Sequence, residues 1–151
     1  MLATAYDPDV GPVLLGALVF ALAPATASPS IVVAFRTPSG NIGCVYDSGS
    51  SSSSGSGTSL RCDIRSRLRP LPPKPRGCDV DWGDSYELGR TGRARITCHG
   101  DTAILLRSRV LRYGSNWTRS GFVCTSRIVG LRCHNASGHG FFLSKQHSYR
   151  F

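Results

Sequence analysis

The sequence predicts an all-β domain, a small disulfide-stapled sandwich or barrel built from antiparallel hairpins. Short segments rich in β-branched and aromatic residues recur about every ten residues from Ile31 to Phe151, with Gly, Asn, Asp or Ser between most of them, which is typical of sandwiches and barrels. The chain also contains six cysteines among its 151 residues. An even number of cysteines in a chain of this size is typical of disulfides in an exported domain.

The N-terminal segment has the features of a signal peptide. Residues 13–22, VLLGALVFAL, form a short apolar run, and Ala25 and Ala27 follow it with the small-x-small spacing that signal peptidase accepts. The run is shorter than the roughly twenty residues that a membrane-spanning helix needs. We therefore predict a signal peptide over residues 1–27, with cleavage after Ala27.

The start of this signal peptide is atypical. It includes Asp7 and Asp9 and no Lys or Arg, whereas a basic start is expected. A mis-assigned start codon and a membrane-anchored signal are the alternatives. We predict a single cysteine-rich domain over residues 28–151, without a transmembrane span, that is secreted or associated with the cell envelope.

The first half of the domain is predicted to contain three strands, within residues 31–37, 41–47 and 59–64. The Ser/Gly-rich residues 48–59 separate the last two and predict a flexible hairpin tip, because they offer little that can pack. Residues 65–77, RSRLRPLPPKPRG, predict an extended basic connector, because proline fixes φ and lacks the backbone donor.

The second half predicts further short strands. Only AILLRSRVL could be argued to be helical, but it lacks a cap and follows the turn residues HGDT, so a strand is preferred. The predicted strand segments are VDWGDSYEL, ARITC, AILLRSRVLRY, NWTRSGFVCTS, GLRCHNA and GFFLSKQHSYRF.

The cysteines allow 15 connectivities, one of which places a turn at the midpoint of every pair. This set is Cys44–Cys62, Cys78–Cys98 and Cys124–Cys133, giving three stapled hairpins. A zinc site is the competing interpretation, but the cysteines lack the short chelating step of zinc motifs, and we expect no metal. Because strand neighbours face opposite sides, inward cysteines would turn Asp63, His99 and His134 outward.

Several motifs in a fixed order resemble a known family. They are TPSGNIGC, LRCDI, CDVDWG, CHGDT, LRYG, the W-T-R-S-G-F-V-C segment, GLRC-x-N and GHGFFLS. Together they are similar to a small exported actinobacterial domain of unknown function, over about residues 33–151. The resemblance implies export and one cysteine-rich domain, and it supplies no catalytic residues.

Candidate catalytic residues are few. His139 lies between two glycines and could act as a base with Asp101 or Asp81, which would make the protein a small exported hydrolase. The alternative is that Gly138 and Gly140 serve a turn that His139 caps. No GxSxG motif is present, and the cysteines are assigned to disulfides.

Charge favours a binding role instead. The chain has 18 Lys and Arg against 9 Asp and Glu, a net charge of +9, which favours anionic partners. The densest basic stretch predicts an anion-binding strip, against the alternative of a solvated loop; its residues are Arg61, Arg65, Arg67, Arg69, Lys74 and Arg76.

We therefore expect a monomeric binding module for an anionic envelope polymer or lipid headgroup, with no cofactor. For an exported protein, exposed aromatic residues beside arginine favour carbohydrate over nucleic acid. A third interpretation is an inhibitor or protein-interaction domain that binds through the Ser/Gly-tipped hairpin.

Overall fold

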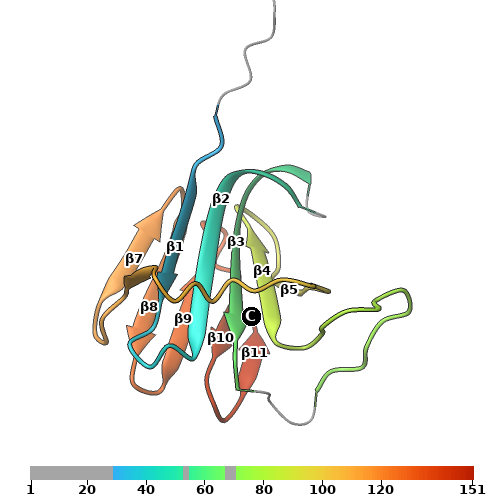
Figure 1. Cartoon of the computed structure of the whole chain (residues 1–151). Coiled ribbons are helices and arrows are strands. Elements are labelled where there is room, and N and C mark those ends of the chain that lie inside the picture. Colours follow the sequence, from blue (N-terminus) through green and yellow to red (C-terminus); the bar gives the residue numbers. More distant parts are fainter. Residues whose placement is uncertain (1–28, 53–54, 67–70) are drawn as a thin grey trace, which may run out of the picture.

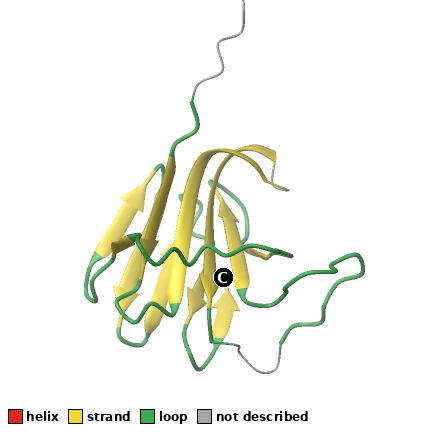
Figure 2. Ribbon diagram, in the orientation of Figure 1, coloured by secondary structure: helices red, strands yellow, loops and turns green. Residues whose placement is uncertain are grey.

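The computed structural model of the protein describes residues 29–52, 55–66 and 71–151, so the predicted signal peptide lies outside the described residues. Within these ranges the chain forms β-strands and no helix (Figures 1 and 2), which confirms the all-β class. It follows that no described helix is long and apolar enough to cross a bilayer. The strands are β1 (Val32–Arg36), β2 (Ile42–Ser52), β3 (Gly55–Ile64), β4 (Ser85–Gly89), β5 (Arg95–Ile96), β6 (Arg109–Val110), β7 (Asn116–Arg119), β8 (Phe122–Arg127), β9 (Gly130–His134), β10 (Gly140–Leu143) and β11 (Ser148–Arg150).

The strands form two sheets that pack as a sandwich. The six-stranded sheet has the order β5-β4-β3-β2-β1-β6, and the five-stranded sheet has the order β11-β10-β9-β8-β7. All named pairings are antiparallel except that of β1 with β6, which is parallel. In Figure 1 the six-stranded sheet lies in front, with β1 beside β7 on the left and β4 and β5 on the right.

One core lies between the two sheets. Strand β8 shows the alternation that a one-sided core produces, because Phe122, Cys124 and Ser126 are fully buried and the residues between them are not. Aromatic pairs join the sheets from one side to the other: Phe35–Trp117 at 4.9 Å between ring centroids, Tyr46–Phe122 at 6.1 Å and Tyr86–Phe141 at 5.7 Å. The core is thus a single apolar layer that both sheets share.

The structure contains three disulfides, Cys44–Cys62, Cys78–Cys98 and Cys124–Cys133, the pairs that the hairpin midpoints predict. The first and third each join directly opposed residues of neighbouring strands, β2 with β3 and β8 with β9. The second lies outside the strands. It joins Cys78, which follows the connector, to Cys98, which follows β5.

Several segments differ in extent from the prediction, two of them with a physical reason. Backbone pairing of β2 with β3 continues through the Ser/Gly-rich residues to Ser52 and Gly55, beyond an irregularity between Asp47 and Ser50. A ladder uses backbone groups alone, so it needs no packing side chains. Residues 103–113, expected as one strand, contribute only the short β6, because their first residues, Ala103 and Ile104, cross the outer face of the six-stranded sheet at Gly43.

Candidate functional site

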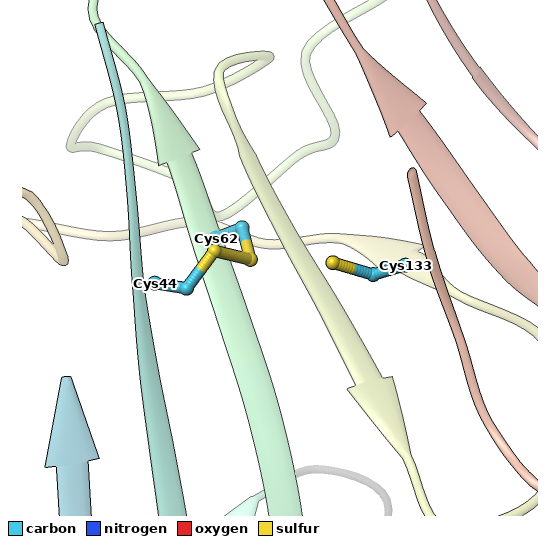
Figure 3. A group of neighbouring side chains, drawn as sticks. All are labelled: Cys44, Cys62 and Cys133. Atoms are coloured by element: carbon cyan, nitrogen blue, oxygen red, sulfur yellow. A yellow bond between two sulfur atoms is a disulfide. The ribbon is translucent and has the colours of Figure 1, made fainter. Parts of the chain in front are cut away.

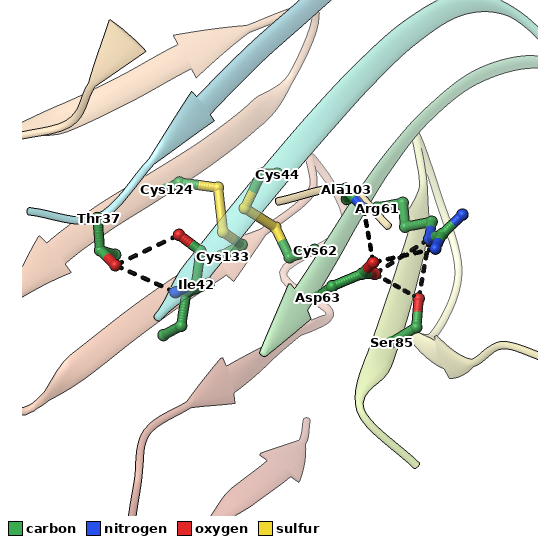
Figure 4. Close-up of a disulfide and its surroundings, with 10 residues drawn as sticks. All are labelled: Thr37, Ile42, Cys44, Arg61, Cys62, Asp63, Ser85, Ala103, Cys124 and Cys133. Carbon is green, nitrogen blue, oxygen red and sulfur yellow. Dashed lines mark hydrogen bonds and ion pairs between the residues drawn. A yellow bond between two sulfur atoms is a disulfide. The ribbon is translucent and has the colours of Figure 1, made fainter. Parts of the chain in front are cut away.

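Asp63 is the centre of a polar cluster on β3. One carboxylate oxygen accepts hydrogen bonds from Nε of Arg61 and from the hydroxyl of Ser85, at 3.0 and 2.7 Å. The other accepts from a second guanidinium nitrogen of Arg61 and from the backbone N–H of Ala103, at 3.0 and 2.6 Å (Figure 4). Asp63 is only 3% exposed, so its charge is balanced inside the protein.

The prediction that Asp63 and His99 face outward is wrong, since both are buried. Asp63 does lie on the opposite side of β3 from Cys62, but the loop containing Ala103 covers that side. His99 follows β5 and forms an isolated bridge with Asp81 through the backbone. The cover over Asp63 comes from Ala103, which is 40 positions further along the chain.

Both ring nitrogens of His99 have partners. Nδ1 lies 2.7 Å from the carbonyl oxygen of Asp101, and Nε2 lies 2.9 Å from a carboxylate oxygen of Asp84. Burial lowers the pKa of His99, but the hydrogen bond to Asp84 and the bond to Asp101 outweigh this effect, and the pKa is raised above its ordinary value. The imidazolium, which donates from both nitrogens, fits this setting.

Arg61 links the same cluster to Asp101. Its guanidinium donates to the Asp101 carboxylate at 2.6 Å and to the Asp101 carbonyl at 3.0 Å. The Arg61 hydrogen bond lowers the pKa of Asp101. Burial lowers the pKa of Arg61, yet its bonds to Asp63 and Asp101 raise it overall. We expected Arg61 in the anion-binding strip, but its guanidinium donates hydrogen bonds to the protein's own carboxylates, those of Asp63 and Asp101.

A hollow of about 460 Å³ lies beside this cluster, and both Asp81 and Asp101 line it together with His99 and Asp84. The arrangement fastens the loop after β5 onto the sheet through ion pairs and backbone contacts. It does not present His99 as a free base, because both ring nitrogens are engaged. Thr102 is the hydroxyl residue of the lining, which includes no Ser, Cys or Lys.

His139 does not join these aspartates. It lies in the turn between β9 and β10, where its backbone N–H donates to Asn135. Asn135 also donates to the carbonyls of Gly89 and Gly92, at 3.0 and 2.8 Å, so this turn meets the far end of β4. Asp84 lies just before the start of β4, and the length of that strand, about 13 Å, separates the two ends. The structure therefore brings Asp81 and Asp101 to one hollow and leaves His139 at the other end.

Of the remaining predicted basic residues, Arg65, Lys74 and Arg76 are exposed, whereas Arg67 and Arg69 lie outside the described residues. The connector after them is held against the body of the domain, since Nε1 of Trp82 donates to the carbonyl of Pro72 at 3.1 Å. The connector residues Leu71–Pro73 therefore lie against the domain, and we call them the Leu71–Pro73 wall.

These connector residues form one side of a groove of about 600 Å³ between the two sheets at their β5 and β11 edges. We call it the edge groove. Arg93 and Arg150 line it, both exposed, and neither forms an ion pair with any residue that the structure describes. No carboxylate side chain is among its lining residues, which are Leu71, Pro72, Pro73, Tyr86, Arg93, Ala94, Ile96, Ser148, Tyr149, Arg150 and Phe151.

Aromatic side chains continue from the edge groove across the outer side of β10 and β11. Tyr149, 46% exposed, stacks on Phe142 with ring centroids 5.3 Å apart. The guanidinium of Arg132 lies 3.6 Å from the ring centroid of Phe151, a cation–π contact. Exposed rings next to arginine form a flat surface on which sugar rings or other planar groups can stack.

The sulfur atoms of Cys44, Cys62 and Cys133 lie within 4.8 Å of one another (Figure 3). Three cysteines this close could hold a metal as thiolates. All three are engaged in disulfides, so this cluster cannot act as a metal site in the oxidised protein.

The sequence did not predict that Arg93 and Arg150 line the same groove. The two residues are far apart in the chain, and their neighbours are ordinary strand and turn residues. It also missed the burial of His99. The only signal for His99 was the CHGDT motif, which places His99 and Asp101 two residues apart.

Comparison with known proteins identifies a family. The family described as "Family of unknown function (DUF6636)" matches residues 13–151. Neither a search of curated proteins nor a search of solved structures found a match.

Proposed function

Because the chain belongs to this family of unknown function, which spans residues 13–151, we propose a function from the geometry alone. We propose that the domain is an envelope-associated or secreted module that binds an anionic glycan in the edge groove. The observation that carries the proposal is that Arg93 and Arg150, which form no ion pair with any described residue, line a groove without a carboxylate side chain. The guanidinium of Arg150 has one internal hydrogen bond within the described chain, from Nη1 to the carbonyl of Ala94 at 3.5 Å.

The charge of the groove supports an anionic ligand. A guanidinium has five N–H donors, and one that forms no ion pair can direct most of them to carboxylate or phosphate oxygens of a ligand. The exposed Lys74 and Arg76 follow the Leu71–Pro73 wall directly in the chain and add positive charge at its end. This connector is part of the basic stretch in which the sequence predicts anion binding.

The aromatic residues support a glycan in particular. Tyr149 and Phe151 belong both to the groove and to the aromatic surface on β10 and β11. A polymer of acidic sugars can place its anionic groups at Arg93 and Arg150 and its rings against Tyr149. The three disulfides support a location outside the cytosol, where such bonds persist.

The alternatives receive less support. A hydrolase using His139 would need Asp81 or Asp101 beside it, and these lie at the other end of β4. An interaction or inhibitor role for the Ser/Gly hairpin depends on its tip at residues 53–54, outside the described residues. No contact in the structure favours either one.

The test measures binding of the exported, oxidised protein to a polyuronate, to polyphosphate and to neutral dextran over a salt series. We expect binding to at least one polyanion that weakens with salt, and no binding to dextran. Arg93→Gln with Arg150→Gln should weaken this binding about tenfold or more, because charge-assisted bonds are lost.

The matched control is Arg90→Gln with Arg107→Gln, which removes the same charge from exposed positions outside the groove. It should change affinity far less. Equal losses in both double variants would show that net charge, not the groove, binds the polymer. The polyuronate and polyphosphate arms separate carboxylate from phosphate as the recognised group.

A further inference from the structure

The turn between β8 and β9 carries two exposed aliphatic residues at its tip. Arg127 pairs with Gly130, so Ile128 and Val129 form the two-residue loop of the hairpin. Ile128 is 84% exposed and Val129 is 66% exposed. These are the highest and the third-highest exposed fractions among the large exposed apolar residues of the described chain.

The fold does not require aliphatic residues at this tip. Two-residue hairpin loops favour Gly, Asn and Asp, which supply positive φ, and β-branched residues fit them poorly. The neighbouring hairpin from β7 to β8 follows this rule, with Ser120 and Gly121 both at positive φ, 47° and 88°. Neither Ile128 nor Val129 has a positive φ. The aliphatic pair therefore lacks a structural reason inside the domain.

Basic residues surround the pair. Arg127 and Lys145 are exposed beside it, and the half-exposed ring of Tyr113 lies on the same side. Together with Ile128 and Val129 they line one hollow of about 260 Å³, which we call the tip hollow. No carboxylate side chain is among the lining residues, the rest of which are Thr37, Ser39, Asn41, Ile42, Gly130, Ser144 and Gln146.

The turns at this end are held rigidly. Ser144 is buried, and its hydroxyl accepts from the backbone N–H groups of Gln146 and His147 at 3.2 and 3.1 Å. This fixes the turn that presents Lys145. The turn containing Tyr113 is tied to β8, because the N–H of Gly114 donates to the carbonyl of Ser126 at 2.8 Å. The tip hollow is thus formed before any partner binds.

We infer that this end of the sandwich docks on a membrane surface rich in anionic phospholipid. Aliphatic residues on a rigid tip can enter the boundary between headgroups and acyl chains, and tyrosine favours the same depth. Arg127 and Lys145 would then contact lipid phosphates, because the negative charge of such a surface attracts basic residues. The polar tip hollow leaves room for a headgroup beside Lys145.

This surface is separate from the edge groove, because the two share no lining residue. The inference therefore goes beyond the proposed function and does not depend on it. A protein docked in this way would hold its groove close to the membrane, within reach of an envelope polymer.

The experiment measures co-sedimentation of the exported, oxidised protein with vesicles of phosphatidylglycerol and phosphatidylcholine mixed, and with phosphatidylcholine alone. We expect binding to the anionic vesicles that decreases with salt. Ile128→Ser with Val129→Ser should weaken it about tenfold or more, since two apolar side chains no longer leave water.

Val32→Ser is the matched control, because Val32 is 59% exposed and lies at the opposite end of β1 from the tip. It should bind as the unchanged protein does. A second readout is Ile128→Trp, whose fluorescence should shift to the blue with anionic vesicles and be quenched by brominated lipids.

Two results would overturn the inference. One is equal vesicle binding by the Ile128→Ser, Val129→Ser variant and the unchanged protein, without a fluorescence shift at position 128. The other is a dimer in sedimentation velocity that the same double substitution abolishes, because the tip would then serve a second copy of the chain.

Discussion

The sulfur atoms of Cys62 and Cys133 lie within 4.8 Å of each other, although they belong to different disulfides and to different sheets. Both residues are fully buried. The two disulfides therefore do more than close two hairpins, because they also fill the middle of the core where the sheets face each other (Figures 3 and 4).

Removing a core disulfide should cost more than removing the peripheral one. Cys44→Ala with Cys62→Ala should lower the free energy of unfolding by about 2–5 kcal/mol, through lost chain constraint and a packing defect. Cys78→Ala with Cys98→Ala is a matched control, because its sequence separation is 20 against 18 and Cys98 is exposed. Urea unfolding measures both, and equal losses would contradict the packing role.

Asn135 should be the most sensitive asparagine in the described chain. It is 1% exposed, and its amide accepts from Ser137 and His139 and donates to Gly89 and Gly92. Asn135→Ala leaves several buried groups unpaired and should cost about 3 kcal/mol or more. Asn116→Ala, on an exposed position of β7, should change stability by about 0.5 kcal/mol or less. Thermal and urea unfolding of both variants measure this difference.

Stability should depend on pH through His99. Because the folded pKa is raised above the ordinary value of 6.5, the imidazolium contribution is fully present below about pH 6.5 and is lost as the pH rises through the folded pKa. Urea unfolding from about pH 5.5 to 9 should show this loss. Asp84→Asn removes the carboxylate partner and should flatten that part of the profile; an unchanged profile would assign the dependence to another group.

Gly140 should not tolerate a side chain. A Cβ there would lie 2.0 Å from the carbonyl oxygen of Cys133 and 2.8 Å from the Cα of His134, both backbone atoms of β9. Gly140→Ala should therefore force β9 and β10 apart and destabilise the domain by more than about 2 kcal/mol.

Gly138 is the control for this substitution. It has a φ of 79° and open space around its Cβ position, so Gly138→Ala should cost only the backbone strain, about 1–2 kcal/mol. If both alanine variants lose the same stability in urea unfolding, backbone conformation rather than strand contact limits Gly140.

Local patterns explain what could be predicted of the fold. Strand periodicity and turn residues act over a few positions, and the disulfide pairs follow hairpins whose partners are close in the chain. The loop from 97 to 108 is different, because its path depends on the bare backbone of Gly43, which allows Ala103 and Ile104 to approach the sheet. Sequence periodicity cannot show such a distant cover, and for this reason Asp63 was expected to be exposed.

The candidate site was less predictable for a related reason. Arg61 and Arg65 both belong to the basic stretch, yet only the fold shows that Arg61 turns toward Asp63 and Asp101 while Arg65 is exposed. Arg93 and Arg150 come together because β5 and β11 are edge strands on the same side of the two sheets. Edge position is a property of the whole topology, not of the residues near either arginine.

The order of the disulfides along the chain has a consequence for biogenesis. Each cysteine bonds to the next one in sequence, so no bridge encloses another or waits for a later segment. A chain that emerges from a translocation pore N-terminus first can close each bridge as soon as its second cysteine appears. An oxidase that joins cysteines in order of arrival would yield the native set directly, without an isomerase to correct wrong pairs.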